Sequence, residues 1–268
     1  MVKIAVAGAK GHMGKMIIDA VWNTEGAELV CALAHKETDH VEANEDAGAS
    51  LGFNSGVKIS CDNETLRTSG AQVLIDFTRP EGTMAFLDIC KDAGIAMVIG
   101  TTGLNAKQKQ KLEEASKVIP IVFAPNMSTG VNVTNKLLAQ AAKLLKDYDC
   151  EIVEMHHSRK VDAPSGTAIA MGKVIAEARG QNFEDVAVWA RQGHTGPRVP
   201  GSIGFAALRG GDVVGDHQVI FAGPGERIVI SHLSSSRAGY AEGSVKAAQH
   251  VVNQKPGLYS MDGVLGLK

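Results

Sequence analysis

The sequence lacks three features that would assign it to a class at once. Acidic and basic residues nearly cancel, leaving a net charge of −2, so the overall charge does not favour nucleic acid or an acidic membrane. There is no run of about 18 apolar residues, the length that a membrane-spanning helix requires. The chain enters a strand pattern at once, without the basic and apolar regions of a secretory signal peptide, so we expect a cytoplasmic protein.

Cysteine is scarce, and its spacing excludes the usual metal and redox motifs. Cys31, Cys61, Cys90 and Cys150 are scattered, and no two form a C-x-x-C pair. We expect reduced thiols rather than disulfides, and no metal site. Glycine is abundant by contrast, at 30 of 268 residues. Such an excess in loops suits a chain whose backbone passes close to ligands.

In the first half of the chain, short apolar segments alternate with segments of helical spacing. Continuous apolar strands separated by helices are typical of a parallel sheet that is covered on both faces. We therefore predict an α/β domain with a Rossmann-like, doubly wound parallel sheet. Residues 35–56 are polar without a clear period and are expected to form a loop. The expected strands are residues 2–7, 27–34, 73–77, 95–99 and 119–123, and the expected helices are residues 13–22, 105–117 and a segment that begins at Pro80.

The pattern changes after Asn126. The apolar runs 202–209, 213–222 and 226–233 follow one another with short glycine-containing turns, which is typical of antiparallel strands. We predict an α+β domain with a mixed, largely antiparallel sheet over 128–237. A last helix at about 238–252 is expected to pack back on the first domain, before a glycine-rich tail. Other expected elements of this half are helices at 130–146 and 165–179, a strand at 152–156 and an apolar run at 186–191.

A glycine motif follows the first expected strand. Gly8, Gly11 and Gly14 have the spacing G-x-x-G-x-x-G between a strand and a helix. A tight turn and the close approach of a pyrophosphate both require residues without a Cβ, and the helix N-terminus supplies N–H donors. The motif predicts a dinucleotide site in a domain made of residues 1–127 and 238–268. A purely structural turn is the alternative.

The second strand ends without the acidic residue that binds the ribose 2′-hydroxyl of NAD. Ala34 stands there, and His35 and Lys36 follow it. These side chains can pair with the 2′-phosphate of NADP, and Lys10 and His12 can add to them. We therefore predict that NADPH is used at least as well as NADH. The alternative, that His35 and Lys36 are only solvated, stays open.

Two further loops end strands at the same expected edge of the sheet, 77–80 and 100–103. Ligands of open parallel sheets bind at the carboxyl ends of the strands. Gly100 and Gly103 allow the backbone to approach a flat ring, and Thr101 and Thr102 offer hydroxyl groups. We expect the nicotinamide near these residues.

A second site is expected at Glu154–Thr167, which holds two histidines, two cations and a carboxylate before a helical pattern. His156 and His157 are adjacent, so on a strand they face opposite sides and do not readily bind one metal. Lys160 supplies a positive charge. The N–H groups of Gly166 and Thr167 begin the helix, where a carboxylate can dock. A capped helix after a polar loop is the alternative interpretation.

The run E-x-H-H-x-x-K-x-D-A-P-S-G-T at Glu154–Thr167 resembles the 4-hydroxy-tetrahydrodipicolinate reductases, also called dihydrodipicolinate reductases, of bacterial lysine biosynthesis. The resemblance covers nearly the whole chain. It implies NAD(P)H-dependent reduction of the dehydrated form of 4-hydroxy-tetrahydrodipicolinate to tetrahydrodipicolinate, in lysine and diaminopimelate biosynthesis. It also implies a homotetramer built through the strand-rich region. Further matching segments are Val2–Gly14, Asp76–Gly82, Val98–Gly103, Asn126–Val133, Gly193–Gly196 and Ser202–Arg237.

On this resemblance, His156 takes the position of the proton donor and Lys160 that of the cation that steadies the substrate. The implied substrate-binding residues are His157, Lys160, Ser165, Gly166, Thr167 and Thr102. The implied cofactor-binding residues are Gly8, Lys10, Gly11, His12, Met13, Arg79, Gly100, Thr102, Asn126 and Met127, to which the reasoning above adds His35 and Lys36.

Three places depart from the family pattern, one of which, the dipeptide Ser158-Arg159, affects local charge but no assigned role. Many members carry an acid where Ala34 stands, and many have a phenylalanine where Met127 stands. Two other functions remain open. One is a different nicotinamide dehydrogenase, acting on an aspartate semialdehyde or a sugar, and a panel of substrates separates it. The other is a dinucleotide-sensing protein without turnover, which would leave NADPH unoxidised in the presence of the dicarboxylate.

Overall fold

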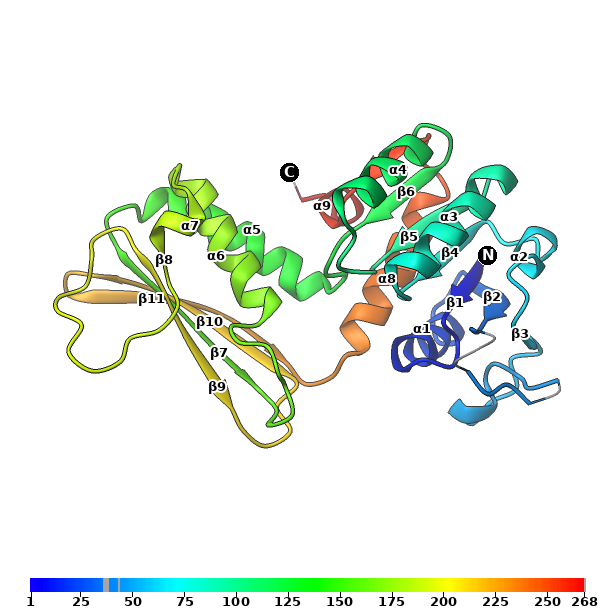
Figure 1. Cartoon of the computed structure of the whole chain (residues 1–268), viewed down its shortest axis with the longest axis horizontal. Helices are drawn as coiled ribbons and strands as arrows, with labels where there is room; N and C mark the ends of the chain where they lie inside the picture. The colour runs from blue at the N-terminus through cyan, green and yellow to red at the C-terminus, as the bar shows by residue number, and fades with distance from the viewer. Residues whose placement is uncertain (36–38, 43, 268) are drawn as a thin grey trace. The chain divides into compact units, whose positions relative to one another are not determined.

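The computed structural model describes residues 1–35, 39–42 and 44–267. These residues form two compact units (Figure 1). Unit 1 comprises Met1–Thr129 and Ala238–Lys268, and unit 2 comprises Gly130–Arg237. Among the described residues, no helix is long and apolar enough to cross a membrane.

Unit 1 is built on a seven-stranded sheet in which every pairing is parallel. The strand order is β12-β6-β5-β4-β1-β2-β3, so the chain leaves β1 first to one side and then to the other. This reversal is the switch point of a doubly wound fold, and it confirms the predicted Rossmann-like sheet. The strands are β1 Val2–Ala7, β2 Ala27–Leu33, β3 Ile59–Ser60, β4 Val73–Asp76, β5 Ala96–Ile99, β6 Pro120–Phe123 and β12 Gly257–Tyr259.

Helices cover both faces of this sheet because successive side chains of a strand point to opposite sides. Ile4 and Val6 of β1 belong to a core that includes residues of α1 and α8. Ala5 and Ala7 belong to a second core, which includes residues of α3 and α4. The helices of unit 1 are α1 His12–Trp22, α2 Thr65–Thr68, α3 Pro80–Ala93, α4 Ala106–Ser116, α8 Ala238–Val251 and α9 Met261–Leu265, and the expected loop at 35–56 contains the short 3-10 helix η1 Ala49–Leu51.

The C-terminal segment completes unit 1. Helix α8 packs on this unit, as the sequence predicted, and buries Ala241, Val245 and Ala248 in the core that contains Ile17 of α1. No element was predicted in the glycine-rich tail, but it contains strand β12, which pairs in parallel with β6. A strand of three residues is too short to display a period, so the sequence pattern missed it.

Unit 2 contains a mixed five-stranded sheet with the order β11-β10-β7-β9-β8. The predicted antiparallel pairing is correct for β10 and β11. For β9 and β10 it is wrong, because β7 lies between them, parallel to β9 and antiparallel to β10. The elements of unit 2, with the N-terminal residue of α5 in unit 1, are α5 Thr129–Leu144, β7 Asp149–His156, α6 Gly166–Arg179, α7 Phe183–Val186, β8 Ala187–Val188, β9 Ile203–Arg209, β10 Gly215–Gly223 and β11 Glu226–Ser234.

The glycine-containing segment after β9 crosses the end of β7 instead of closing a hairpin. Gly210 N donates to His156 O at 2.9 Å, and His157 N donates to Val213 O at 2.7 Å. These hydrogen bonds pair backbone groups at the end of β7 with residues 210–213, where the sequence predicted a short turn between two antiparallel strands. The crossing therefore places the last residues of β9 directly beside His156.

One face of this sheet is apolar and covered by helices. Ile152, Phe205 and Val219 lie in a core with Leu138 of α5 and Met171 of α6. The opposite face carries exposed apolar side chains in unit 2. Leu208 is 49% exposed, Val229 51% and Leu233 63%.

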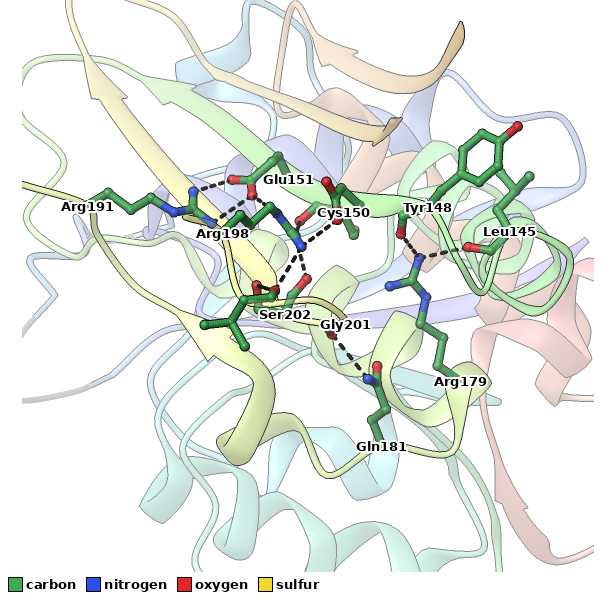
Figure 2. A network of polar contacts seen from close by, with 12 residues as sticks. Leu145, Tyr148, Cys150, Glu151, Arg179, Gln181, Arg191, Arg198, Gly201 and Ser202 are labelled. Atoms are coloured by element: carbon green, nitrogen blue, oxygen red, sulfur yellow. Dashed lines mark hydrogen bonds and ion pairs between the residues drawn. The ribbon is translucent and has the colours of Figure 1, made fainter. Parts of the chain in front are cut away.

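Arginines fasten the long segment between β8 and β9 to strand β7 (Figure 2). Arg191 donates to both carboxylate oxygens of Glu151 at 2.8 Å. Arg198 donates to Glu151 at 3.0 Å and to the carbonyls of Cys150 and Ser202 at 2.9 and 2.6 Å. Burial raises the pKa of Glu151, but the hydrogen bonds from the two arginines outweigh it and hold the pKa below its usual range.

Candidate active site

The helix-covered face of β7 changes from apolar to polar along its length. Cys150 and Ile152 belong to the core of unit 2, and Glu154 and His156 continue the same face, since they follow at intervals of two. Strand register places His217 of β10 opposite Glu154 and Arg209 of β9 opposite His156. A cluster of ionisable groups therefore replaces the core where helix α6 begins.

Glu154 is at the centre of this cluster and is only 1% exposed. Its Oε2 contacts His156 Nδ1 at 2.6 Å and accepts from Arg209 Nη1 at 2.8 Å. Its Oε1 accepts from Ser165 N at 3.0 Å and from Arg209 Nη2 at 2.9 Å. Burial raises the pKa of Glu154, but these hydrogen bonds outweigh it, so the pKa lies below its usual range and the carboxylate is ionised at neutral pH.

Ser165 connects helix α6 to the histidines. Its Oγ accepts from Ala168 N at 3.2 Å as the N-cap of the helix, and it bonds His217 Nε2 at 2.8 Å. The His156 and His217 rings meet edge to face, with centroids 5.2 Å apart. Burial, supported by the charge of His156, lowers the pKa of His217 to about 4, so its ring is neutral at pH 7.

The predicted cation, Lys160, lies in the loop between β7 and α6. Its Nζ donates to Asp162 Oδ1 at 2.7 Å, and this bond lowers the pKa of Asp162. His157 follows the end of β7, and partial burial together with nearby cations such as Arg159 lowers the pKa of its ring. The loop thus holds an ammonium group and a second imidazole close to His156 in sequence.

Helix α6 begins at Gly166, one residue after the predicted start, with Ser165 as its cap. Gly166 is exposed, and a Cβ on it would meet nothing within 4 Å. Thr167 is half-buried in the first turn, and the dipole of the helix makes this end partially positive. Glu154 therefore connects His156 to Ser165, while Lys160 lies in the adjoining loop and Gly166 and Thr167 lie in the first turn of α6.

In unit 1, the glycine motif forms a turn that fits a pyrophosphate. Gly8 has a φ of +70°, which favours glycine, and Gly11 N donates to Gly8 O at 2.8 Å. A Cβ on Gly14 would lie 2.0 Å from Gly8 O, and one on Gly11 would lie 3.1 Å from it. Helix α1 starts directly after Gly11, so its first N–H groups point out of this turn. The residues present are those that a dinucleotide cofactor needs.

The charged residues near this turn are arranged less simply than the sequence suggested. Lys10 Nζ is paired with Glu45 Oε1 at 2.5 Å, so a phosphate has to compete with a carboxylate for it. His12 and Met13 lie in the first turn of α1. His35 is exposed, and its N donates to Asp39 Oδ2 at 2.8 Å. Lys36 lies outside the described residues.

The loops after β4 and β5 are joined by a buried acid. Asp76 Oδ1 accepts from Thr78 N at 2.9 Å and from Thr78 Oγ1 at 2.6 Å. Burial raises the pKa of Asp76 despite these bonds. Thr101 is also buried, and its Oγ1 accepts from Thr83 Oγ1 at 2.9 Å, so it serves the fold of unit 1. The exposed residues of these loops are Arg79, Thr102 and Gly103.

The ring that approaches Gly100 in the structure belongs to Phe77. A Cβ on Gly100 would lie 2.2 Å from Phe77 Cε1, so the chain's own packing already requires glycine there. Met127 is fully buried in the core of unit 1. Its carbonyl O lies 1.8 Å from the position of a Cβ on Gly243, so α8 packs closely on its backbone. Asn126 Oδ1 accepts from Ser128 N at 2.9 Å.

Sequence reasoning missed Arg209 and His217, which are both in direct contact with the cluster. Arg209 is the last residue of the expected run 202–209, and His217 lies in the middle of the expected run 213–222. The one available signal for His217 was the alternation of side chains along a strand, which places it on the same face as the buried Val219 and Phe221.

Among the described residues, no group of three or more His, Cys, Asp or Glu side chains is arranged to hold a metal ion.

Comparisons with known proteins agree along the whole chain. The family model "Dihydrodipicolinate reductase, N-terminus" matches residues 2–127, and "Dihydrodipicolinate reductase, C-terminus" matches residues 130–265. The 4-hydroxy-tetrahydrodipicolinate reductase of Polynucleobacter necessarius subsp. necessarius (strain STIR1) is 60% identical over 267 residues, which are 99% of each chain. The reductase of the same name from Cupriavidus metallidurans is 57% identical, over 99% of this chain and 100% of the relative.

A solved structure carries the comparison into three dimensions. Dipicolinate-bound dihydrodipicolinate reductase from Paenisporosarcina sp. TG-14 superimposes with a TM-score of 0.78, at 28% identity and with 97% of each chain covered. Both halves of the chain match the family, and the relatives are matched over nearly their whole length. The chain belongs to the dihydrodipicolinate reductase family.

Proposed function

We propose that this protein reduces the dehydrated form of 4-hydroxy-tetrahydrodipicolinate to tetrahydrodipicolinate with NAD(P)H, in lysine and diaminopimelate biosynthesis. The observation that carries the proposal is the cluster at the start of α6. It combines an imidazole on an ionised carboxylate, an ammonium group and a helix N-terminus within residues 154–167. The substrate is a dicarboxylate, and a relative with the same fold was solved with dipicolinate bound.

The glycine turn and the N-terminus of α1 bind the pyrophosphate of the cofactor in this proposal. The absence of Cβ atoms at Gly8, Gly11 and Gly14 lets the phosphates reach backbone N–H groups. Exposed Arg79 and Thr102 follow β4 and β5, at the edge where the reactive ring of a dinucleotide binds in such folds. The reduced nicotinamide supplies a hydride when it is bound.

The residues of unit 2 bind the substrate and supply the proton. One carboxylate docks on Lys160 Nζ, and the other docks at the first turn of α6, at Gly166 and Thr167. Each charge-assisted hydrogen bond contributes about 1.5–3 kcal/mol. When hydride adds to the conjugated double bond, negative charge moves toward the ring nitrogen, where a cation stabilises it. The imidazolium form of His156 delivers a proton from Nε2 to the carbon of that double bond next to the one that takes the hydride. The ring is left neutral with its hydrogen on Nδ1, which contacts Glu154.

NADPH is the expected cofactor, with NADH used no better. Ala34 directly follows β2 and brings no carboxylate that would repel a 2′-phosphate, and exposed His35 comes next. Lys10 adds a further cation once it exchanges Glu45 for the phosphate. Kinetics with each nucleotide at saturating substrate provide the measurement.

Nucleotide oxidation with enzymatically generated substrate tests the proposed function directly. The expected result is loss of the reduced nicotinamide absorbance only when the dicarboxylate is present. Absorbance that stays constant with both nucleotides would contradict an enzyme and favour a protein that only binds the dinucleotide. Oxidation with an aspartate semialdehyde or a sugar, but not with the dicarboxylate, would favour a different dehydrogenase.

The exposed apolar face of the five-stranded sheet supports assembly into a homotetramer. Leu208, Val229 and Leu233 lie on this face, and apolar sheet faces in solvent favour association. We expect a tetrameric mass by light scattering at micromolar concentration. Val229→Glu places a charge on this face and should yield smaller species, whereas a tetramer that persists in this variant would move the interface elsewhere.

A further inference from the structure

The carboxylate of Glu154 is saturated by donors from three different segments. His156 and Arg209 bond its Oε2, and Ser165 N and Arg209 bond its Oε1, at 2.6 to 3.0 Å. The side chain is buried, so solvent cannot replace these partners when one is lost. Glu154 therefore connects the end of β7, the last residue of β9 and the cap of α6.

This arrangement decides which nitrogen of His156 is free to exchange a proton. An ionised carboxylate only accepts hydrogen bonds, so the 2.6 Å contact requires the hydrogen on Nδ1. The other ring nitrogen, Nε2, lies 3.0 Å from the position that a Cβ on Gly215 would take. Arg209 already neutralises the charge of Glu154, so the main effect on His156 is on its tautomer and orientation.

Arg209 also extends to the loop that carries Lys160. Its Nη2 donates to the carbonyl of Asp162 at 2.6 Å, and the carboxylate of Asp162 accepts from Lys160 at 2.7 Å. The Arg209 guanidinium thus contacts Glu154, which binds the His156 ring, and Asp162, which binds the Lys160 ammonium group. Its planar fork fixes both directions at once, which a lysine cannot do.

We infer that Glu154 and Arg209 form a pair of positioning residues, which hold His156 with Nδ1 protonated and set its place relative to Lys160. The inference rests on the proposed function, in which His156 gives a proton from Nε2. Neither residue has to touch the substrate. Their part is to orient Nε2 of His156 in one direction. Because Arg209 also contacts Asp162, the same pair fixes the position of His156 relative to the loop that carries Lys160.

Glu154→Gln tests the tautomer. Three residues donate four hydrogen bonds to the carboxylate, and the amide NH₂ of glutamine can accept none of these bonds, so the variant loses the contacts of one oxygen. With the NH₂ toward His156, the neutral ring carries its hydrogen on Nε2 instead of Nδ1. We expect ¹⁵N spectra of histidine-labelled protein to show this exchange, and kcat to fall about 10–100-fold with the KM for the nucleotide unchanged. His156→Gln identifies the resonance among the nine histidines.

Arg209→Lys tests the fork, and unit 2 offers a matched control. Arg191 binds both oxygens of Glu151 on the same strand with the same geometry, away from the cluster (Figure 2). Both substitutions keep the charge and remove a two-bond contact. We expect Arg209→Lys to lower kcat about tenfold and to broaden or shift the His156 signals. Arg191→Lys should leave kcat and these signals as in the wild type.

The outcomes separate this inference from the proposed function. Wild-type protein whose neutral His156 carries the hydrogen on Nε2 would overturn the inference even if Glu154→Gln failed to fold. A wild-type tautomer and kcat in Glu154→Gln would also overturn it. His156→Gln with wild-type kcat would instead refute the role of His156 in the proposed function. The expected fall for His156→Gln is about 10²–10⁴-fold.

Discussion

The neutral His217 makes the stability of unit 2 depend on pH. Burial lowers its pKa from 6.5 to about 4 in the folded protein, whereas the unfolded chain keeps a value near 6.5. Between these values the unfolded state binds more protons, so stability falls as the pH decreases. The effect is absent well above pH 6.5 and complete below pH 4. At pH 5 it amounts to about 2 kcal/mol of unfolding free energy relative to pH 8.

His217→Gln isolates this contribution. The amide keeps a polar group for Ser165 Oγ but takes up no proton, so the variant should lose about 2 kcal/mol of the difference between pH 8 and pH 5. His194→Gln, which removes an exposed imidazole of the same unit, is the matched control and should keep the wild-type difference. Other groups that titrate in this range cancel when variant and wild type are compared.

The measurement has to follow unit 2 by itself, because a chain of two units need not unfold in one step. The sequence contains two tryptophans, Trp22 in α1 and Trp189 in unit 2. Trp189 stacks on Phe205, with ring centroids 5.2 Å apart, so its fluorescence reports on this core. Urea titrations in a Trp22→Phe background give the required free energies. Equal pH dependence in wild type and His217→Gln would refute the reasoning.

Three other substitutions address the two sites. Lys160→Ala should lower kcat and raise the KM for the dicarboxylate in steady-state kinetics, while Arg159→Ala, at an exposed neighbour, should change neither value. Wild-type kcat and KM in Lys160→Ala would refute the role of Lys160 in binding the substrate. Gly14→Ala places a Cβ 2.0 Å from Gly8 O and should destabilise unit 1 by about 1–3 kcal/mol and weaken NADPH binding, as seen by fluorescence titration; wild-type affinity would contradict a rigid turn. Ala34→Asp should reduce kcat/KM for NADPH about tenfold or more relative to NADH, whereas Ala34→Asn should not. If the ratio of kcat/KM for NADPH to that for NADH is the same in Ala34→Asp and in the wild type, this position does not discriminate the 2′-phosphate.

The parallel sheet was predictable because its signals are local. Continuous apolar runs such as Val73–Asp76 and Ala96–Ile99 are buried on both faces and are separated by helices with clear starts, among them Pro80. Strand β12 and the insertion of β7 between β9 and β10 were not predictable in this way. Three residues carry no period, and the place of β7 depends on pairings between segments far apart in the chain.

The candidate site likewise has a part that the sequence could predict and a part that it could not. The run from His156 to Thr167 is contiguous, so its residue types alone indicated two imidazoles, a cation and a helix N-terminus, and the family resemblance added the role of proton donor for His156. Arg209 and His217 contact this run only through strand register, which a single sequence does not display. For Met127, the family resemblance implied contact with the cofactor. The structure shows that its side chain is fully buried in the core of unit 1, which the matching segment did not indicate.

The two ends of the chain together make unit 1, and this has a consequence for biosynthesis. A ribosome that has released the polypeptide up to Arg237 has completed the five-stranded unit, while the sheet begun by the first residues still lacks α8 and β12. Until the last segment emerges, Ile17 and Val245 cannot meet, and the apolar surface around Ile17 stays open to chaperones. Truncation near residue 237 should therefore yield aggregated nascent protein in cell-free translation, although the strands of β1 to β6 are all present.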